Sequence, residues 1–504
     1  MDVSLVRQIV QPLGNVTLSR RRVLRGLAGL AAAGSGASLA GCGDGSGGSA
    51  QTPPARVPPA SGTPLWRLQN ALARGARPSV ATAGITVTQG AARSADPSIG
   101  ADALIVPTPR GMAVNPNPDS LATLPNVWGY RRDTWKPSTA GYIGSAASND
   151  SWYVPIAQWH NAATLGSLST CGLHFTLTGR GFEVLFAGTD VRVTLLADGE
   201  YAAPGVIETE LQSGVPGAPL ANPNAYVRFD FGSSATRKIS LYAMSSQGPC
   251  AIAIAKLDTL TPWDRAGEPS FCAITDSYGE LRGVNWAIGG PFWEAASLLG
   301  IPHLDLNAIG GTGYAPNNRN DAFRNPGNAF VARVAEGALT APDLVLTAGG
   351  INDNNSIAAL PLYASAAEAK AGFDAAVQRY FRDLRAALPD ALLAAMGPWA
   401  PVESVPVDVF AQSKADTILA ALRSIAGPWV FLDNLHGGWT TSAGASAAAT
   451  GRGWQTGTGN AGQPRGDGNG DMYVAADGVH PTPAGCQYLG GVIAAQLSAA
   501  ILAF

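Results

Sequence analysis

The stretch FCAITDSYGE, Phe271–Glu280, begins as an apolar run of strand type and ends abruptly in a polar turn. The run predicts a buried strand that delivers Ser277 to its very end. A solvated turn uses serine without any chemistry, but a catalytic serine occupies the same kind of place. The rest of the sequence therefore has to show whether Ser277 is a turn residue or a catalytic residue.

Strand-type and helical runs alternate from about residue 262 onward. The expected strands are SFCAITD, PHLDLNAIG, PDLVLTAGG, ALLAAMGPW and WVFLDN. Among the helices, SAAEAKAGFDAAVQRYFRDLRAAL carries apolar residues along one side, namely Phe373, Val377, Phe381, Leu384 and Leu388. This alternation predicts βαβ units and a parallel sheet covered on both faces. Ligands bind at the carboxyl ends of the strands in such sheets, where Ser277 is expected.

A different pattern precedes the α/β part. From Gly172 to about Leu257 the chain reads as short alternating or apolar runs, among them LHFTLTG, FEVLFAG, YVRFDFG and KISLYAM. Most of them are closed by Gly, Asp or Ser, which is typical of an antiparallel β-sandwich. We therefore expect an all-β domain over residues 64–261 and an α/β domain over residues 262–504.

The first 41 residues predict an export signal. The segment SRRRVLRG resembles a twin-arginine signal, and the apolar stretch after it is shorter than the about 18 residues that a spanning helix needs. It ends in LAGC, which resembles a bacterial lipobox and implies lipidation of Cys42. Residues 42–63 are rich in Gly and Ser, then in Pro, and predict a flexible tether. We expect an exported, membrane-anchored lipoprotein of the cell envelope, on its periplasmic or cell-surface side.

The net charge limits the classes of binding partner, and the number of cysteines bears on whether the protein contains disulfides. The chain of 504 residues has a formal net charge of -3, which disfavours nucleic acid as a partner. Four further cysteines form an even set, which permits disulfides in an exported protein. We expect the pairs Cys171–Cys250 and Cys272–Cys486. Buried free thiols are the alternative, because twin-arginine cargo usually folds before export.

A nucleophilic serine needs a base, and the candidates are histidines. Two of the five histidines, His436 and His480, end Asp-x-x-His motifs that begin at Asp433 and Asp477. The other three lie in or before predicted strands: His160, His174 and His303. A closing helix anchors His480, whereas His436 leads into the long insertion 437–473, so His480 is the preferred base and Asp477 its orienting partner. A solvated turn is the alternative for either motif.

Donors for a developing oxyanion are expected in the turns after the second and third strands. These turns read NAIGGTGY and TAGGINDNN, with Gly311 and Asn352 as candidates. Glycine and asparagine are also default turn residues, so each turn alone is a weak signal. Which glycine of the first turn donates stays open by one position.

Together, the blocks Asp-Ser, Gly, Gly-x-Asn-Asp and Asp-x-x-His-Pro-Thr, in that order over about residues 265–504, resemble the SGNH (GDSL-type) hydrolase family. The resemblance implies a flavodoxin-like α/β/α sandwich and serine ester hydrolysis without metal or other cofactor. It also implies roles for particular residues: Ser277 as nucleophile and backbone donor, Gly311 as second backbone donor, Asn352 as side-chain donor, His480 as base and Asp477 as its partner. One departure is Thr275, where the family has glycine.

The β-rich region is similar in arrangement to the jelly-roll domains that precede the catalytic domain in some SGNH esterases, including carbohydrate deacetylases. We therefore expect an ester substrate, preferably an O-acyl or O-acetyl group on a polysaccharide. Trp439 and Trp454 in the insertion could stack on a sugar or line an acyl pocket, and ordinary packing is the alternative. Hydrolysis of simple acyl or lipid esters, acyl transfer, and a non-catalytic glycan-binding lipoprotein are the rival functions.

The insertion also contains residues with the spacing of a calcium loop, Asp467, Asn469 and Asp471. Met472 stands at the position that requires glycine, and Gly478 stands where a calcium loop has glutamate. We interpret this segment as a polar turn and expect no metal site.

Overall fold

The computed structural model describes the following residues: 59–73, 85–90, 104–107, 154–161, 166–187, 192–203, 207–208, 224–245, 249–262, 267–280, 289–301, 303–308, 310–316, 329–338, 341–353, 365–398, 409–434 and 480–504. The predicted signal, the lipobox cysteine Cys42 and most of the tether lie outside them.

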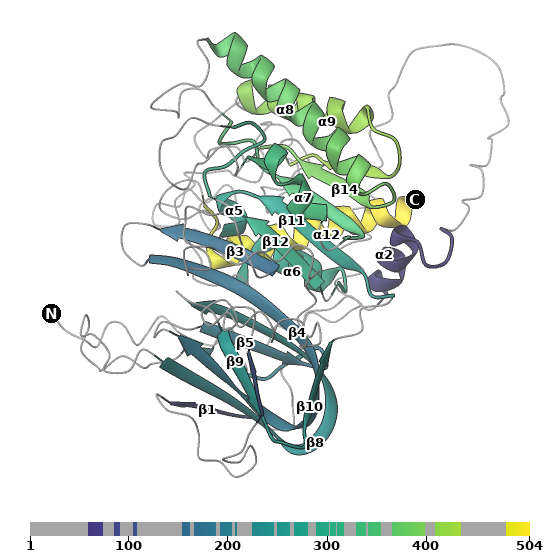
Figure 1. Ribbon diagram of the computed structural model, residues 1–504. Coiled ribbons are helices and arrows are strands. Elements are labelled where there is room, and N and C mark those ends of the chain that lie inside the picture. Colours follow the sequence, from purple (N-terminus) through teal and green to yellow (C-terminus); the bar gives the residue numbers. More distant parts are fainter. Residues whose placement is uncertain are drawn as a thin grey trace, which may run out of the picture. The chain divides into compact units, whose positions relative to one another are not determined.

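The α/β part is built on a parallel sheet, as the alternation of strands and helices predicts (Figure 1). Within the described residues it has five strands: β11 (Ser270–Thr275), β12 (His303–Ala308), β13 (Leu344–Ala348), β14 (Leu392–Met396) and β15 (Trp429–Leu432). Their order in the sheet is β12-β11-β13-β14-β15, and every neighbouring pair is parallel. In chain order this is 2-1-3-4-5, the flavodoxin-like arrangement of a doubly wound sheet.

Helices cover both faces of the sheet because successive strand residues point to opposite sides. On β11, Phe271 and Ala273 enter one core, and Cys272 and Ile274 enter the other. The first core contains residues of three helices, α2 (Pro64–Leu72), α6 (Pro291–Leu298) and α12 (Pro483–Ala503). The second is covered by α7 (Val334–Ala338), α8 (Ala366–Ala387) and α9 (Val409–Arg423).

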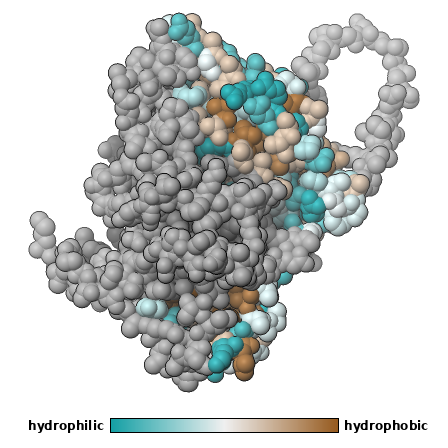
Figure 2. Space-filling view, viewed as in Figure 1, coloured by the Kyte–Doolittle hydropathy of each residue, from teal (hydrophilic) through white to brown (hydrophobic). Residues whose placement is uncertain are grey.

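Helix α8 has the amphipathic character that its sequence predicts. Its five expected core residues are all buried: Phe373, Val377, Phe381, Leu384 and, just past the helix end, Leu388. Figure 2 shows hydrophilic and hydrophobic residues side by side over the part of the molecule where α8 lies. Helix α8 also carries ion pairs one helical turn apart, Lys370–Asp374 at 2.6 Å and Arg379–Asp383 at 3.2 Å.

The predicted bridge between Cys272 and Cys486 is not formed: neither residue is in a disulfide, and both are buried. Cys272 faces the core under α7, α8 and α9, whereas Cys486 faces the core on the other side of the sheet. The backbone of the sheet therefore separates the two sulfur atoms. Burial raises the pKa of the Cys486 thiol to about 12. The side chains of Cys171 and Cys250 lie outside the described part, and their pairing stays a prediction.

The β-rich region forms an antiparallel sheet around two long strands, β4 (Gly166–Ala187) and β8 (Asn224–Ser245). In the described residues it has ten strands in the order β2-β9-β4-β8-β5-β6; β1 also pairs with β8, β3 and β10 with β4, and β7 with β5. The bounds of the shorter strands are β1 (Thr86–Gly90), β2 (Leu104–Pro107), β3 (Val154–Asn161), β5 (Arg192–Ala197), β6 (Glu200–Tyr201), β7 (Ile207–Glu208), β9 (Pro249–Ile254) and β10 (Thr259–Pro262).

Two pairs of runs that look like separate strands in the sequence are continuous strands in the structure. LHFTLTG and FEVLFAG both belong to β4, and YVRFDFG and KISLYAM both belong to β8. The register between β4 and β8 shifts at the bulge between Gly179 and Gly181, and Gly232 opposite it has φ +75°. Glycines that resemble turn signals therefore mark a β-bulge instead.

Helix α2 packs on the α/β part, although residues 64–261 were expected to form the β domain. Leu68 and Ala71 join the core around α12, and Gln69 Nε2 donates to the Ile501 carbonyl at 3.0 Å. The helix begins after Thr63, whose Oγ1 accepts from Trp66 N–H at 3.3 Å. The chain therefore contributes a helix to the α/β part before it enters the antiparallel sheet.

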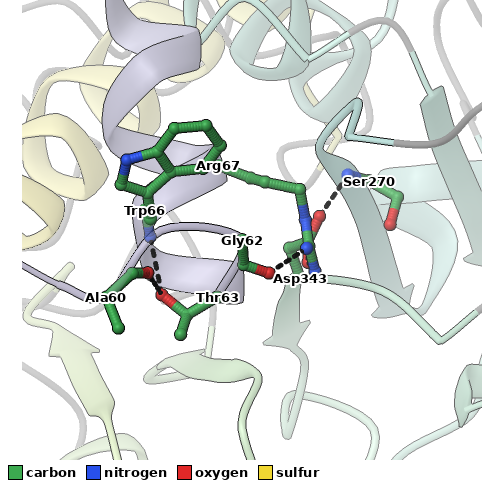
Figure 3. Close-up of polar contacts among 7 residues, drawn as sticks. All are labelled: Ala60, Gly62, Thr63, Trp66, Arg67, Ser270 and Asp343. Carbon is green, nitrogen blue, oxygen red and sulfur yellow. Dashed lines mark hydrogen bonds and ion pairs between the residues drawn. The ribbon is translucent and has the colours of Figure 1, made fainter.

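An ion pair fastens α2 to the amino-terminal edge of the parallel sheet (Figure 3). Arg67 Nε donates to Asp343 Oδ1 at 3.1 Å, and the other carboxylate oxygen accepts from Ser270 N–H at 3.0 Å. Asp343 precedes β13, and Ser270 begins β11. The carboxylate therefore joins two neighbouring strands and one helix.

The closing helix α12 is long and apolar enough, by length and composition, to cross a membrane. One side of this helix is buried in the core on the α6 face of the sheet. The buried residues on that side are Leu489, Ile493, Leu497 and Ile501. This is the arrangement of a core helix in a folded domain.

Candidate active site

Ser277 lies where ligand sites form in a doubly wound sheet. It follows β11, the strand at which the chain reverses its direction of winding, and it begins the short helix α5 (Ser277–Glu280). The turn passes very close to the strand ends. A Cβ atom at Gly279 would collide with the Thr275 methyl group and with Ala308 Cβ, so only glycine fits there.

Thr275, which stands where the SGNH pattern has glycine, is accommodated by that same Gly279. It is the last residue of β11 and pairs with Ala308 of β12 and Ala348 of β13. Its methyl group fills the space that a side chain at position 279 would need. The Thr275 hydroxyl is buried without a hydrogen-bond partner, and the extra side chain leaves the turn to Ser277 intact.

His480 is brought to Ser277 from 203 residues away. Its Nε2 lies 2.8 Å from Ser277 Oγ, within hydrogen-bond distance. The imidazole is 7% exposed, and its ring centroid lies 5.7 Å from that of Tyr278. Thr482, two residues after the histidine, caps α12, and its Oγ1 accepts from Gly485 N–H at 3.1 Å. A base is thus held rigidly at the hydroxyl that it would deprotonate.

The other members of the two Asp-x-x-His motifs are only partly described. Asp477 and His436 both lie outside the described residues, whereas Asp433 directly follows β15. The orienting role of Asp477 and the preference for His480 over His436 therefore stay predictions. The same holds for the insertion, with Trp439, Trp454 and the calcium-like spacing of Asp467, Asn469 and Asp471.

The two candidate oxyanion turns lie side by side. Gly311, after β12, has φ +73°, in the left-handed region that favours glycine. Asn352, after β13, donates through Nδ2 to the Thr312 carbonyl at 3.0 Å. Asp353 accepts from the N–H groups of Tyr314 and Ala315, both at 2.9 Å. The second turn therefore clamps the first, and both lie at the strand ends beside Ser277.

Asp276, directly before the serine, is completely buried. Its carboxylate accepts from Tyr278 N–H at 3.1 Å and has a longer contact, 3.4 Å, with Asn352 Nδ2. Burial raises the pKa of Asp276 to about 7; the Tyr278 N–H and Arg333 oppose this rise, and the Asp353 charge adds to it. The carboxyl group next to the candidate nucleophile can therefore hold a proton near neutral pH.

Asp353 is the second buried carboxyl group of the site. Burial raises its pKa to about 6, against the lowering effects of Lys414 and of the N–H groups of Ala315 and Tyr314. Lys414, on α9, donates to the Gly350 carbonyl at 2.8 Å, in the turn that carries Asn352 and Asp353. A cation from the helix layer thus holds this turn and stabilises its carboxylate.

Sequence reasoning assigned no role to Asp276, Arg333 or Lys414. Asp276 had a visible signal, because it forms the Asp-Ser pair with the candidate nucleophile. Arg333 and Lys414 stand in amphipathic helical runs, where a basic residue ordinarily faces solvent. No signal in one sequence distinguishes them from surface residues.

No family model matches this chain, and no curated protein matches it in sequence. Among solved structures, a salicylyl-acyltransferase from a tetracycline biosynthetic pathway is 13% identical, with a TM-score of 0.41, covering 65% of this chain and 82% of that one. A carbohydrate esterase family 2 enzyme of Corynascus thermopiles (Myceliophthora fergusii) with a carbohydrate binding domain is 18% identical, with a TM-score of 0.40, covering 69% and 98%.

An acetyl xylan esterase from the rumen bacterium Butyrivibrio proteoclasticus is 14% identical, with a TM-score of 0.37, covering 69% of this chain and 96% of that one. These are similarities to esterases and to an acyltransferase. Likenesses of this size do not assign an activity to this chain.

Proposed function

We infer that the protein is a serine ester hydrolase of the SGNH type. The observation that carries this inference is the 2.8 Å contact between Ser277 Oγ and His480 Nε2 at the carboxyl end of the parallel sheet. A serine and a histidine 203 residues apart, joined at a topological switch point, form the nucleophile and base of acyl transfer chemistry.

In the proposed reaction, Ser277 Oγ attacks the ester carbonyl carbon while its proton passes to His480 Nε2. The negative charge on the carbonyl oxygen is stabilised by the N–H groups of Ser277 and Gly311 and by Asn352 Nδ2. The tetrahedral intermediate expels the alcohol, which takes the proton from His480. Water then attacks the acyl carbonyl carbon and gives a proton to His480. The second tetrahedral intermediate expels Ser277 Oγ, which takes that proton from His480, and the acid is released.

We propose an O-acetyl or other O-acyl group on a carbohydrate as the substrate. The support is the arrangement predicted from the sequence, a β-rich region before the hydrolase part and two tryptophans in a Gly-rich insertion. Simple acyl esters and transfer to another alcohol are the outcomes that a product analysis would separate from this substrate.

The first experiment compares hydrolysis of 4-nitrophenyl acetate by the protein without residues 1–42 and by its Ser277→Ala variant. The matched control is Ser424→Ala, which removes a hydroxyl that donates to the Ala421 carbonyl at 2.7 Å, just past the end of α9. We expect turnover by the parent protein and the control, and a loss of about 10³-fold or more in Ser277→Ala.

Equal turnover in Ser277→Ala and the parent protein would contradict the assignment of Ser277 as nucleophile. Acetylated xylan and short acetylated oligosaccharides then test the substrate class. Release of acetate by the parent protein and not by Ser277→Ala supports a carbohydrate esterase. Acetyl transfer to an added alcohol in place of release would make the protein an acyltransferase.

We also propose that the protein is exported and anchored to a membrane by a lipid on Cys42. The support is the order of a twin-arginine motif, an apolar stretch and the lipobox LAGC in the sequence. In a bacterial host, the full chain is expected in the membrane fraction, and Cys42→Ala is expected to lose lipid labelling. Equal labelling of the two proteins would contradict the anchor.

A further inference from the structure

Arg333 is a buried cation at the edge of the candidate site. It stands between the 3-10 helix η5 (Phe330–Ala332) and α7, and its side chain is 1% exposed. Removing a guanidinium from water is costly unless its donors find partners. A buried arginine at this place therefore requires a compensating set of contacts.

The guanidinium joins three segments that end at the site. Nη1 donates to the carbonyl and the side-chain oxygen of Asn307, at 3.0 and 2.8 Å. Nη2 donates to the Thr275 carbonyl at 3.1 Å and to Thr312 Oγ1 at 3.2 Å. Cζ also lies 4.8 Å from the centre of the Phe330 ring. The planar fork thus links the carboxyl ends of β11 and β12 to the turn after β12.

Each linked segment leads to a residue of the proposed chemistry. Thr275 is two residues before Ser277, and Thr312 is next to Gly311. The Thr312 carbonyl also accepts from Asn352 Nδ2 at 3.0 Å, so the fork reaches the third oxyanion donor through a single residue. The same charge acts on Asp276 beside the serine and opposes the rise of its pKa.

We propose that Arg333 is a positioning residue of the esterase, whose guanidinium fork holds the Gly311 turn against the Ser277 turn so that the oxyanion donors converge. This inference rests on the proposed function. A lysine keeps the charge but cannot make two parallel pairs of contacts, so the geometry of the fork is the property under test.

The experiment measures kcat and KM for 4-nitrophenyl acetate in the parent protein, Arg333→Lys and Arg333→Met, together with the rate of labelling by a fluorophosphonate probe. A tetrahedral phosphonate adduct occupies the oxyanion site, so the labelling rate reports its geometry without turnover. We expect kcat and labelling to fall about 10- to 100-fold in both variants, with KM changed about 3-fold or less.

The pH dependence of kcat/KM separates two contributions of Arg333: the geometry of its guanidinium and its positive charge. Losing the cation in Arg333→Met raises the pKa of Asp276 further, since Arg333 lowers it and Asp353 raises it in the parent protein. Any part of kcat/KM that requires the ionised Asp276 carboxylate is therefore expected to be lost at a higher pH in Arg333→Met than in the parent protein. In Arg333→Lys this loss is expected at a pH near that of the parent protein while kcat stays low.

Arg385→Met is the matched control, because Arg385 performs the same kind of linking at the other edge of the sheet. It donates to four backbone carbonyls, those of Leu388, Pro389, Ala391 and Pro428, at 3.1, 2.9, 2.8 and 2.6 Å. Ala391 precedes β14 and Pro428 precedes β15. We expect this variant to lose thermal stability while keeping kcat and labelling per folded molecule.

A kcat and labelling rate within about 2-fold of the parent protein in a folded Arg333 variant would overturn the inference, as would full rescue by lysine. If Arg333→Met does not fold, Arg333→Lys decides alone, with rates expressed per folded molecule from circular dichroism. A parent protein without Ser277-dependent turnover would contradict the proposed function itself, which is a separate result.

Discussion

At the amino-terminal edge of the parallel sheet, the buried Asp343 carboxylate accepts from Arg67 Nε at 3.1 Å and from Ser270 N–H at 3.0 Å. At the carboxyl-terminal edge, the buried Asp276 carboxylate accepts from Tyr278 N–H at 3.1 Å and lies 3.4 Å from Asn352 Nδ2. Both carboxylates have an arginine nearby. Asp343 forms a direct ion pair with Arg67, whereas Arg333 donates to neutral oxygen atoms of Asn307, Thr275 and Thr312.

The comparison suggests different uses of charge at the two edges: stability at the amino-terminal edge and chemistry at the carboxyl-terminal edge. The direct ion pair of Asp343 ties α2, β11 and β13 together, which is a structural use of charge. Asp276 is buried with less compensation, and its pKa rises to about 7 as a result. Strongly perturbed carboxyl groups collect at functional sites, because positioning and electrostatics there take precedence over stability.

The largest expected effect comes from the base. His480→Ala is expected to lower kcat by about 10³-fold or more, because Ser277 loses the group that accepts its proton. His436→Ala is the matched change in the other Asp-x-x-His motif and is expected to keep near-normal kcat. Steady-state hydrolysis of 4-nitrophenyl acetate measures both. An inactive His436 variant beside a normal His480 variant would move the catalytic base to the other motif.

The next effect tests the oxyanion donors at the carboxyl-terminal edge. Asn352→Ala removes a donor that contacts the Thr312 carbonyl and faces Asp276. We expect kcat to fall about 10²- to 10³-fold with little change in KM, because the donor acts mainly on the charge of the transition state. Asn70→Ala, at an exposed helix position, serves as the control. A larger change in KM than in kcat would indicate a substrate-binding role instead.

Asp276→Asn tests the cost of the buried carboxyl group. The folded-state pKa, about 7, is above the ordinary value of 3.8, so the folded protein keeps the proton that the unfolded chain releases as the pH rises. The free energy of unfolding therefore falls between about pH 4 and pH 7, by on the order of a few kcal/mol. Relative to the parent protein, Asp276→Asn should gain more thermal stability at pH 8 than at pH 5.

The control for that change is Asp383→Asn on the solvated side of α8, where the shift in stability should be small at both pH values. Thermal denaturation followed by circular dichroism measures the difference. An Asp276→Asn effect that is the same at pH 5 and pH 8 would contradict the raised pKa.

The smallest effect belongs to the amino-terminal edge. Arg67→Met removes the cation from the buried Asp343 carboxylate and should lower the free energy of unfolding by about 1–3 kcal/mol, since the Arg67 side chain is partly exposed. Because the change lies at the edge opposite Ser277, kcat per folded molecule should not change. Urea denaturation and initial rates measure the two quantities. A loss of kcat without a loss of stability would contradict the purely structural role of the amino-terminal edge.

The features of this protein that depend on local sequence patterns could be predicted from the sequence. Strand ends and turn residues were sufficient to predict the parallel sheet. They also singled out Ser277 and His480, whose side chains meet at 2.8 Å, and the catalytic roles of the two residues stay predictions. Sequence reasoning was wrong about Cys272–Cys486, because the side of the sheet that a residue faces depends on the strand pairing and on the crossover of each helix. It also missed the continuity of β4, because Gly179 and Gly181 look the same in a turn and in a bulge.

The residues that support the site were the hardest to predict. Arg333 lies in an amphipathic helical run, where a charged residue ordinarily faces water, and its partners come from positions 275, 307 and 312. Those partners meet only when β11 and β12 pair in register. A buried cation of this kind depends on the tertiary structure, and no local sequence pattern predicts it.

The most direct test of the central claim is to find which residue is covalently modified by an ester-like inhibitor. The protein without residues 1–42 would be treated with a fluorophosphonate, digested and analysed by mass spectrometry, beside Ser277→Ala. We predict one stoichiometric adduct, on the peptide that contains Ser277, and no adduct in the variant. An adduct on another serine, or equal labelling of both proteins, would contradict the assignment of Ser277 as the nucleophile.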